Sequence, residues 1–143
     1  MESIKKDHYG QLQYIVQDFC RSVKIPFTGK EEDFRTFEVD LDLVPVIKQY
    51  VKGKEKKELE KIEWCFEINF EEVKEMFDPT VEKIIRLIRD QLGKNKECSA
   101  IFLVGGFSES KYLQARIRKE FGEVVPNISV PSHPTVSVLK GGK

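Results

Sequence analysis

The residues best suited to chemistry are two glycines and two serines that follow a short apolar run, Gly105, Gly106, Ser108 and Ser110. Glycine has no β-carbon, so it can take positive φ and let a ligand or another backbone approach closely. The serines can accept hydrogen bonds from the free amides at the start of a helix. In open α/β sheets, ligands bind beyond the carboxyl ends of strands, where helix amino termini point. This turn is therefore a candidate nucleotide site.

The same turn has a plainer interpretation, because glycines with serine caps are the ordinary way to build a tight connection from a strand to a helix. The sequence lacks the third glycine of the dinucleotide fingerprint and the Gly-Lys-Ser/Thr of a Walker loop. The turn alone favours the plainer interpretation, and further residues must decide between the two.

No residue presents a catalytic pattern. His133 precedes a proline without a nucleophile signature beside it, so we expect a structural hydrogen-bonding role. The serines of the turn have no visible Asp and His partners, so the sequence does not support a hydrolase triad. The three cysteines, Cys20, Cys65 and Cys98, are widely spaced, with only two histidines in the chain. We expect reduced thiols, and neither a disulfide framework nor a zinc site.

The elements that must position the turn are a strand before it and a helix after it. Residues 101–104 form a continuous apolar run, which predicts a strand buried on both faces of a mostly parallel sheet. Leu113, Ile117 and Phe121 recur at helical spacing, and Gly122 is placed to end that helix. A second short strand is predicted from Asn127 to Pro131, followed by a turn in which Thr135 caps a last short helix ending at Gly141.

A long helix is predicted upstream, from Glu71 to about Leu92, with the apolar stripe Val73, Phe77, Val81, Ile84, Ile85, Ile88 and Leu92. Pro79 lies inside it, so we expect a kink or break near residues 77–78. Asn69 can cap this helix, and residues 64–70 alternate as in a half-buried strand, with Trp64, Phe66, Ile68 and Phe70 on one side.

The first half of the chain gives weaker signals. We expect a helix from Tyr9 to Val23, a charged loop over 28–33, a short strand over 34–39 and a helix over 43–51 capped by Asp40 or Asp42. The mixed-charge stretch 54–61 predicts a solvated helix face or an exposed loop.

Composition limits the function classes. The chain has 143 residues, enough for one core, with 24 basic and 24 acidic residues that are interleaved. The balanced charge creates no net electrostatic attraction to nucleic acid or to an anionic membrane. No apolar run is long enough to cross a bilayer, and the first residues lack the apolar segment of a signal peptide. We expect a cytoplasmic protein without nucleic-acid or membrane partners.

Beyond these patterns, residues 103–114 resemble the adenosine-side motif of the seventy-kilodalton heat-shock protein family, whose ATPase domain has an actin-like fold. Residues 76–81, Met-Phe-Asp-Pro-Thr-Val, are similar to the family segment that precedes this motif, and His133–Gly141 occupies the place of a later family stretch. The phenylalanine after the glycines and the Leu-Lys-Gly ending are closer to the divergent heat shock 70 kDa protein 12 branch. The similarity covers about half of the chain, from Trp64 onward.

The resemblance implies an α/β fold, part of an actin-like ATPase domain with a mixed sheet and helices. Residues 1–78 would be an outer-lobe-like α+β segment, and residues 79–143 part of the nucleotide-side lobe. It implies that ATP or ADP is bound through Gly105, Gly106, Phe107, Ser108 and Glu109, with magnesium held only through the nucleotide.

The resemblance also sets limits. The glycine-rich phosphate hairpins and the lysine of the family have no counterpart, so the chain should be a fragment or truncated product that does not hydrolyse ATP alone. Glu109 replaces a family arginine that packs on adenine, and Thr135 replaces a family aspartate, so nucleotide affinity should be weak or absent. The expected partner is the missing N-terminal part of a chaperone-type ATPase domain. The alternative is a non-catalytic module that binds another protein through the surface from Phe34 to Lys61.

Overall fold

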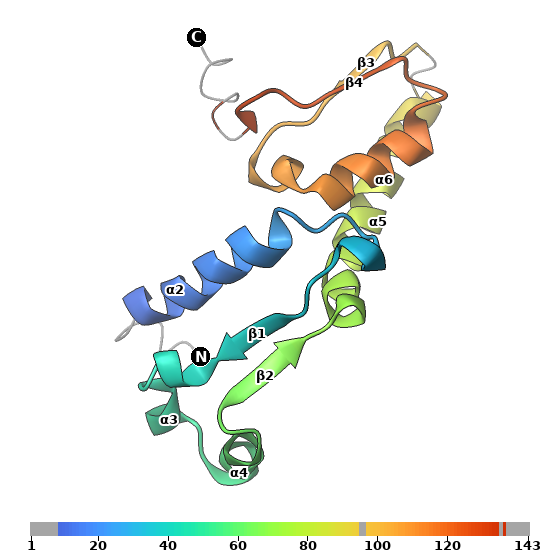
Figure 1. Cartoon of the computed structure of the whole chain (residues 1–143). Coiled ribbons are helices and arrows are strands. Elements are labelled where there is room, and N and C mark those ends of the chain that lie inside the picture. The colour runs from blue at the N-terminus through green and yellow to red at the C-terminus, as the bar shows by residue number, and fades with distance from the viewer. Residues whose placement is uncertain (1–8, 95–96, 135, 137–143) are drawn as a thin grey trace.

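The structure, a computed structural model, describes residues 9–94, 97–134 and 136 and shows two small sheets connected by one long helix (Figure 1). Strands β1 (Phe37–Asp40) and β2 (Cys65–Ile68) form an antiparallel pair, and β3 (Ala100–Phe102) and β4 (Asn127–Ser129) form a parallel pair. Helix α5 (Phe70–Lys94) leads from the first pair to the second, and α6 (Lys111–Phe121) packs beside α5. This mixture of helices and small sheets is compatible with the predicted α/β class.

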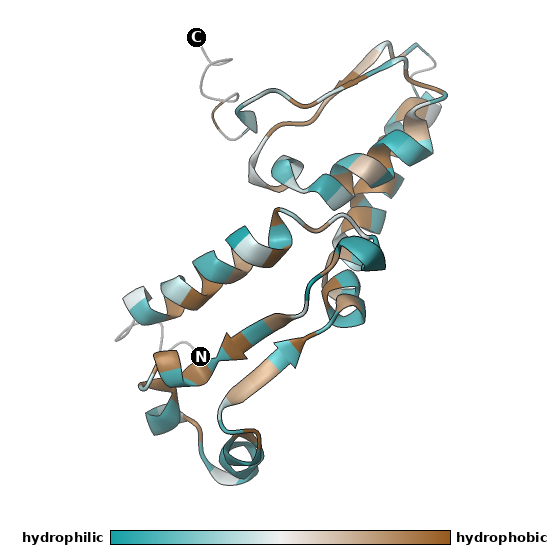
Figure 2. Ribbon diagram, viewed as in Figure 1, coloured by the Kyte–Doolittle hydropathy of each residue, from teal (hydrophilic) through white to brown (hydrophobic). Residues whose placement is uncertain are grey.

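Helix α2 (Tyr9–Phe19) lies along β1, and its apolar side faces that strand (Figure 2). The ring of Phe19 meets that of Phe37 edge-on, with 5.7 Å between the ring centroids. The expected helix from Tyr9 to Val23 is confirmed, although its last turn, Cys20–Lys24, is π-helical. This turn ends just before Pro26, which cannot donate the next backbone hydrogen bond.

The remaining outer elements are short. Two 3-10 turns cover Glu31–Asp33 and Leu41–Leu43, and two helices follow, α3 (Ile47–Tyr50) and α4 (Gly53–Lys61). The predicted helix over 43–51 begins later than expected, because the Asp40 carboxylate accepts a hydrogen bond from the Asp42 amide (2.8 Å) and caps a 3-10 turn instead. Helix α4 buries no side chain, which confirms the prediction for residues 54–61.

Helix α5 begins with a reciprocal cap. The backbone amide of Asn69 donates to the Glu72 carboxylate (2.8 Å), and the backbone amide of Glu72 donates to the side-chain oxygen of Asn69 (3.0 Å). The predicted stripe is confirmed, since Val73, Phe77, Val81 and Ile85 are buried. The expected break near residues 77–78 does not occur, since α5 continues without interruption through Pro79 and buries apolar side chains on both sides of the proline. The proposed boundary between residues 78 and 79 therefore lies inside one helix, and the division into two segments stays a prediction.

The β3–β4 pair and α6 form a helix-on-sheet unit. Leu113, Ile117 and Phe121 are buried as predicted, and Gly122 follows the last helical residue. The predicted strands are confirmed but shorter than expected. Burial of the first strand on both faces is wrong, because Leu103 is 8% exposed whereas Phe102 is 70% and Val104 48% exposed. One face packs on α6, and the opposite face is open. The predicted last helix and its cap Thr135 lie outside the described residues, except Val136.

Among the described residues, an apolar core joins the end of the first helix and its loop to α5, α6 and the β3–β4 pair. Its buried residues are Val23, Phe27, Val73, Phe77, Val81, Ile85, Leu103, Tyr112, Leu113, Ile117, Phe121 and Val125. Within the described residues, no helix is both long enough and apolar enough to cross a bilayer.

Candidate functional site

The Gly-Gly turn leaves β3 in a conformation that requires glycine. Gly105 has φ +93°, a value that side-chain-bearing residues rarely adopt, and its amide donates to the carbonyl of Pro134 (2.9 Å). Gly106 then begins a 3-10 turn, Gly106–Glu109, which leads into α6. The backbone thus turns sharply at the carboxyl end of β3 and enters a helix, as the sequence predicts.

The two serines have different roles. The Ser110 hydroxyl accepts a hydrogen bond from the Leu113 amide (3.3 Å), which confirms its predicted role as the cap of α6. Ser108 does not cap a helix. Its hydroxyl donates to the Gly105 carbonyl (2.5 Å), and the Gln114 side chain donates to the Ser108 carbonyl (2.7 Å). The Ser108 side chain is buried, and these hydrogen bonds fix the shape of the turn, while its predicted role in binding a nucleotide stays a prediction.

The space beside the glycines is open. A β-carbon added to Gly105 or Gly106 would meet no atom within 4 Å. These glycines are therefore not required by close packing within the described chain. Because this space is open and the two glycines have no side chains, an external molecule can come close to the backbone here.

Phe107 extends from this turn into an open hollow of about 440 Å³. The hollow is lined by Phe19, Lys24, Met76, Phe77, Thr80 and Phe107. The Lys24 ammonium lies 5.6 Å from the centroid of the Phe107 ring, and the Phe107 and Phe77 rings are 6.0 Å apart. A flat apolar group could stack in this hollow while Lys24 balances negative charge at its edge.

The sequence-predicted site residues are thus one contiguous turn, and the structure adds partners from distant parts of the chain. Glu109 is the last residue of the 3-10 turn. Lys24 comes from the π-helical end of the first helix, and Met76 and Thr80 come from α5. Sequence analysis missed these residues. Phe19 and Phe77 carried only the helical periodicity of core residues, and no local pattern singled out Lys24.

A polar cluster that sequence analysis also missed ties α5 to α6. The buried Tyr112 hydroxyl donates to the Asp78 carboxylate and accepts from Arg116 (2.9 Å), and Lys74 pairs with Asp78 at 2.6 Å. Arg116 also pairs with Glu82. Partial burial alone would raise the pKa of Asp78, but hydrogen bonds from Lys74 and Tyr112 outweigh it and lower that pKa below 3.8. Burial and the Asp78 hydrogen bond raise the pKa of Tyr112.

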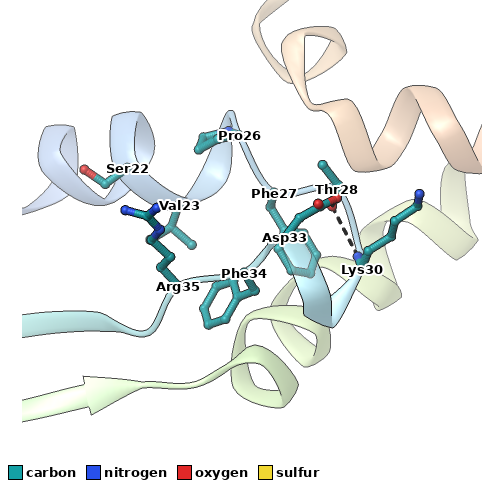
Figure 3. Close-up of a pocket in the computed structure, with 9 residues that line it drawn as sticks. All are labelled: Ser22, Val23, Pro26, Phe27, Thr28, Lys30, Asp33, Phe34 and Arg35. Carbon is teal, nitrogen blue, oxygen red and sulfur yellow. Dashed lines mark hydrogen bonds between the residues drawn. The ribbon is translucent and has the colours of Figure 1, made fainter.

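A second hollow of about 200 Å³ lies beside the loop that joins the first helix to β1 (Figure 3). Thr28 donates its hydroxyl hydrogen to Asp33 (2.9 Å) and accepts from the Lys30 amide (3.3 Å). These bonds hold Gly29, at φ +78°, against the ring of Tyr112. The hollow does not share a lining residue with the one at Phe107, and we treat the loop as a structural support for α6.

In the described ranges, no three His, Cys, Asp or Glu side chains gather closely enough to hold a metal ion. The thiols of Cys20, Cys65 and Cys98 are partly exposed and not linked.

Comparison with known proteins gives a partial relationship. A stretch of 68 residues, 46% of this chain, is 35% identical to the human Heat shock 70 kDa protein 12A, and the mouse protein of that name matches equally well. This supports an Hsp70-like relation. The chain spans about a tenth of the length of these curated relatives. No family model matches the chain, and no solved structure does.

Proposed function

We propose that this chain contributes the adenosine side of a nucleotide site in an Hsp70-like ATP-binding domain and does not hydrolyse ATP on its own. The observation that carries the proposal is the open Gly105–Gly106 turn beside the hollow of Phe107 and Lys24. A base can stack on the Phe107 ring, and the sugar can approach the glycine backbone. The partial likeness to Heat shock 70 kDa protein 12A supports the same assignment.

The residues also support the expectation of weak affinity. Glu109, at the end of the 3-10 turn, adds negative charge near the place where a polyphosphate would extend. Lys24 is the one basic side chain among the described residues that line the hollow, and a single half-buried lysine provides little compensation for the charge of a polyphosphate. ATP or ADP would bind weakly, and magnesium would be held through the nucleotide phosphates.

The proposed partner is the rest of a larger ATPase domain. Parallel sheets are normally covered on both faces, yet Phe102 in β3 and Val104 just after it are exposed to solvent. Further chain that covers this face would complete the sheet and supply the phosphate-binding groups that this sequence lacks. Under this proposal, the activity belongs to a chaperone-type protein of the cytoplasm and not to this chain alone.

The test is titration of the whole chain with Mg-ADP, followed by heat release and by backbone amide NMR shifts. We expect shifts confined to residues 105–109 and to Lys24, and loss of these shifts in Gly106→Val. The added branches would block backbone approach, while a β-carbon at Gly106 meets no atom of the described residues within 4 Å. Gly93→Val is the matched control, because a β-carbon there also meets nothing.

Two outcomes would overturn the proposal. One is absence of any shift at millimolar Mg-ADP in a folded sample, and the other is binding that Gly106→Val leaves unchanged. Either result would favour the alternative, a non-catalytic interaction module that uses the surface from Phe34 to Lys61.

A further inference from the structure

An open groove, distinct from the two hollows described above, lies between β2 and the first turns of α5. Its volume is about 370 Å³, and its lining consists of Phe66, Glu67, Ile68, Glu72, Glu75 and Met76. Phe66 is 37% and Met76 53% exposed, so apolar surface is open to solvent along this groove. Met76 also contributes to the hollow at Phe107, but the other lining residues differ.

The charged side chains that line the groove are all negative. All three of its ionisable lining residues are glutamates, and all three are exposed. Glu72 is engaged in the cap of α5, but Glu67 and Glu75 form no ion pair within the residues that the structure describes. Exposed apolar surface beside unpaired carboxylates favours a partner that combines apolar side chains with positively charged ones.

The strand that borders the groove has a free edge. In the described part of the chain, β2 pairs with β1 alone, so its other side carries backbone donors and acceptors without strand partners. An extended peptide can add to such an edge and direct alternate side chains into a groove. Met76 suits this role, because its unbranched thioether adapts to different apolar shapes.

We infer that this groove binds an extended segment of another protein in which apolar and basic side chains alternate. The segment pairs with the free edge of β2, its apolar side chains lie on Phe66 and Met76, and its basic side chains face Glu67 and Glu75. This inference does not depend on nucleotide binding, because the Gly-Gly turn contributes no residue to the groove.

The test uses a fluorescent peptide of alternating leucine and arginine, titrated with the whole chain and followed by anisotropy. We expect saturable binding that salt weakens, and slower hydrogen exchange of the β2 amides in the complex. Charge reversal in Glu67→Lys/Glu75→Lys should raise the Kd by about tenfold, since each exposed pair contributes a fraction of a kcal/mol to about one. Met76→Asp should also weaken binding.

The matched control is Glu55→Lys/Glu58→Lys, which makes the same charge change on α4, where no side chain is buried. We expect this variant to bind the peptide with nearly unchanged Kd. Equal binding of a leucine–glutamate peptide, equal loss in both double variants, or no binding by the folded parent chain would each overturn the inference. Concentration-dependent self-association that Met76→Asp abolishes would also overturn it, because the occupant would then be a second copy of the chain.

Discussion

Gly29 lies so close to the ring of Tyr112 that a β-carbon there would come within 3.0 Å of its Cδ2 and Cε2 atoms. Gly29 also has φ +78°, so an alanine would be strained in two independent ways. We expect Gly29→Ala to lower the free energy of unfolding by about 3 kcal/mol, combining overpacking and left-handed strain. Urea unfolding measures the change.

Gly53→Ala separates these two causes. Gly53 has φ +69°, but a β-carbon there meets nothing within 4 Å. This variant should lose only the strain, about 1 kcal/mol. Equal losses in the two variants would contradict the role of the Tyr112 contact.

The Asp78 carboxylate makes the stability of the chain depend on pH. Its pKa is lower in the folded chain than the usual 3.8, so its contribution is fully present above that value. The contribution is lost as pH falls through 3.8 and then through the lower folded pKa. We therefore expect the stability difference between the parent chain and Asp78→Asn to shrink as pH falls from 6 to 3. Urea unfolding across this range measures it, and a difference that grows on acidification would contradict the assigned direction.

At the scale of elements, the α5–α6 contact combines apolar packing with the Tyr112 hydroxyl, which donates to Asp78 and accepts from Arg116. Tyr112→Phe keeps the ring against Gly29 but removes these two bonds. We expect a loss of about 1–2 kcal/mol, because Asp78 would keep only Lys74 and a more distant Arg116. Tyr112→Phe in an Asp78→Asn background should cost less than in the parent chain. Additive losses would show that the two groups do not act together.

Elements with a complete local pattern were predictable. The stripe of α5, the cap that Asn69 forms, and the α6 residues Leu113 and Ile117 all follow from spacing and side-chain type. Helix α5 was predicted to break at Pro79 because the local cost was considered alone. The apolar stripe runs through Phe77 and Val81 on either side of the proline, but the pattern does not show that their tertiary packing outweighs the local cost of Pro79.

Contacts between distant segments could not be predicted. Glycine content indicated that residues 105–106 form an open turn, but nothing local placed Lys24 beside Phe107 or Gly29 against Tyr112. These contacts depend on how the first helix and its loop fold back onto α5 and α6. The sequence therefore predicted the Gly-Gly turn but not the hollow beside it. Nucleotide binding by Gly105 and Gly106 stays a prediction.

At the scale of the whole molecule, the open face of β3 distinguishes this chain from a complete α/β sheet. Leu103 is buried in the core that includes the apolar side of α6, whereas Phe102 is mostly exposed on the opposite face. Leu103→Ala should therefore cost about 2–4 kcal/mol, as expected for a buried leucine. Phe102→Ser should change the stability by no more than about 0.5 kcal/mol. The same Phe102→Ser variant should reduce binding of a hydrophobic dye, because contiguous exposed apolar surface attracts such probes.

Urea unfolding and dye fluorescence of the two variants together test whether β3 is a strand with one covered face. A large stability loss in Phe102→Ser would show that its side chain is covered in solution, either by chain outside the described residues or by a second copy. Sedimentation at several concentrations separates these two cases, since only self-association depends on concentration. A small loss with reduced dye binding would leave the β3 face available to the larger domain that the proposed function requires.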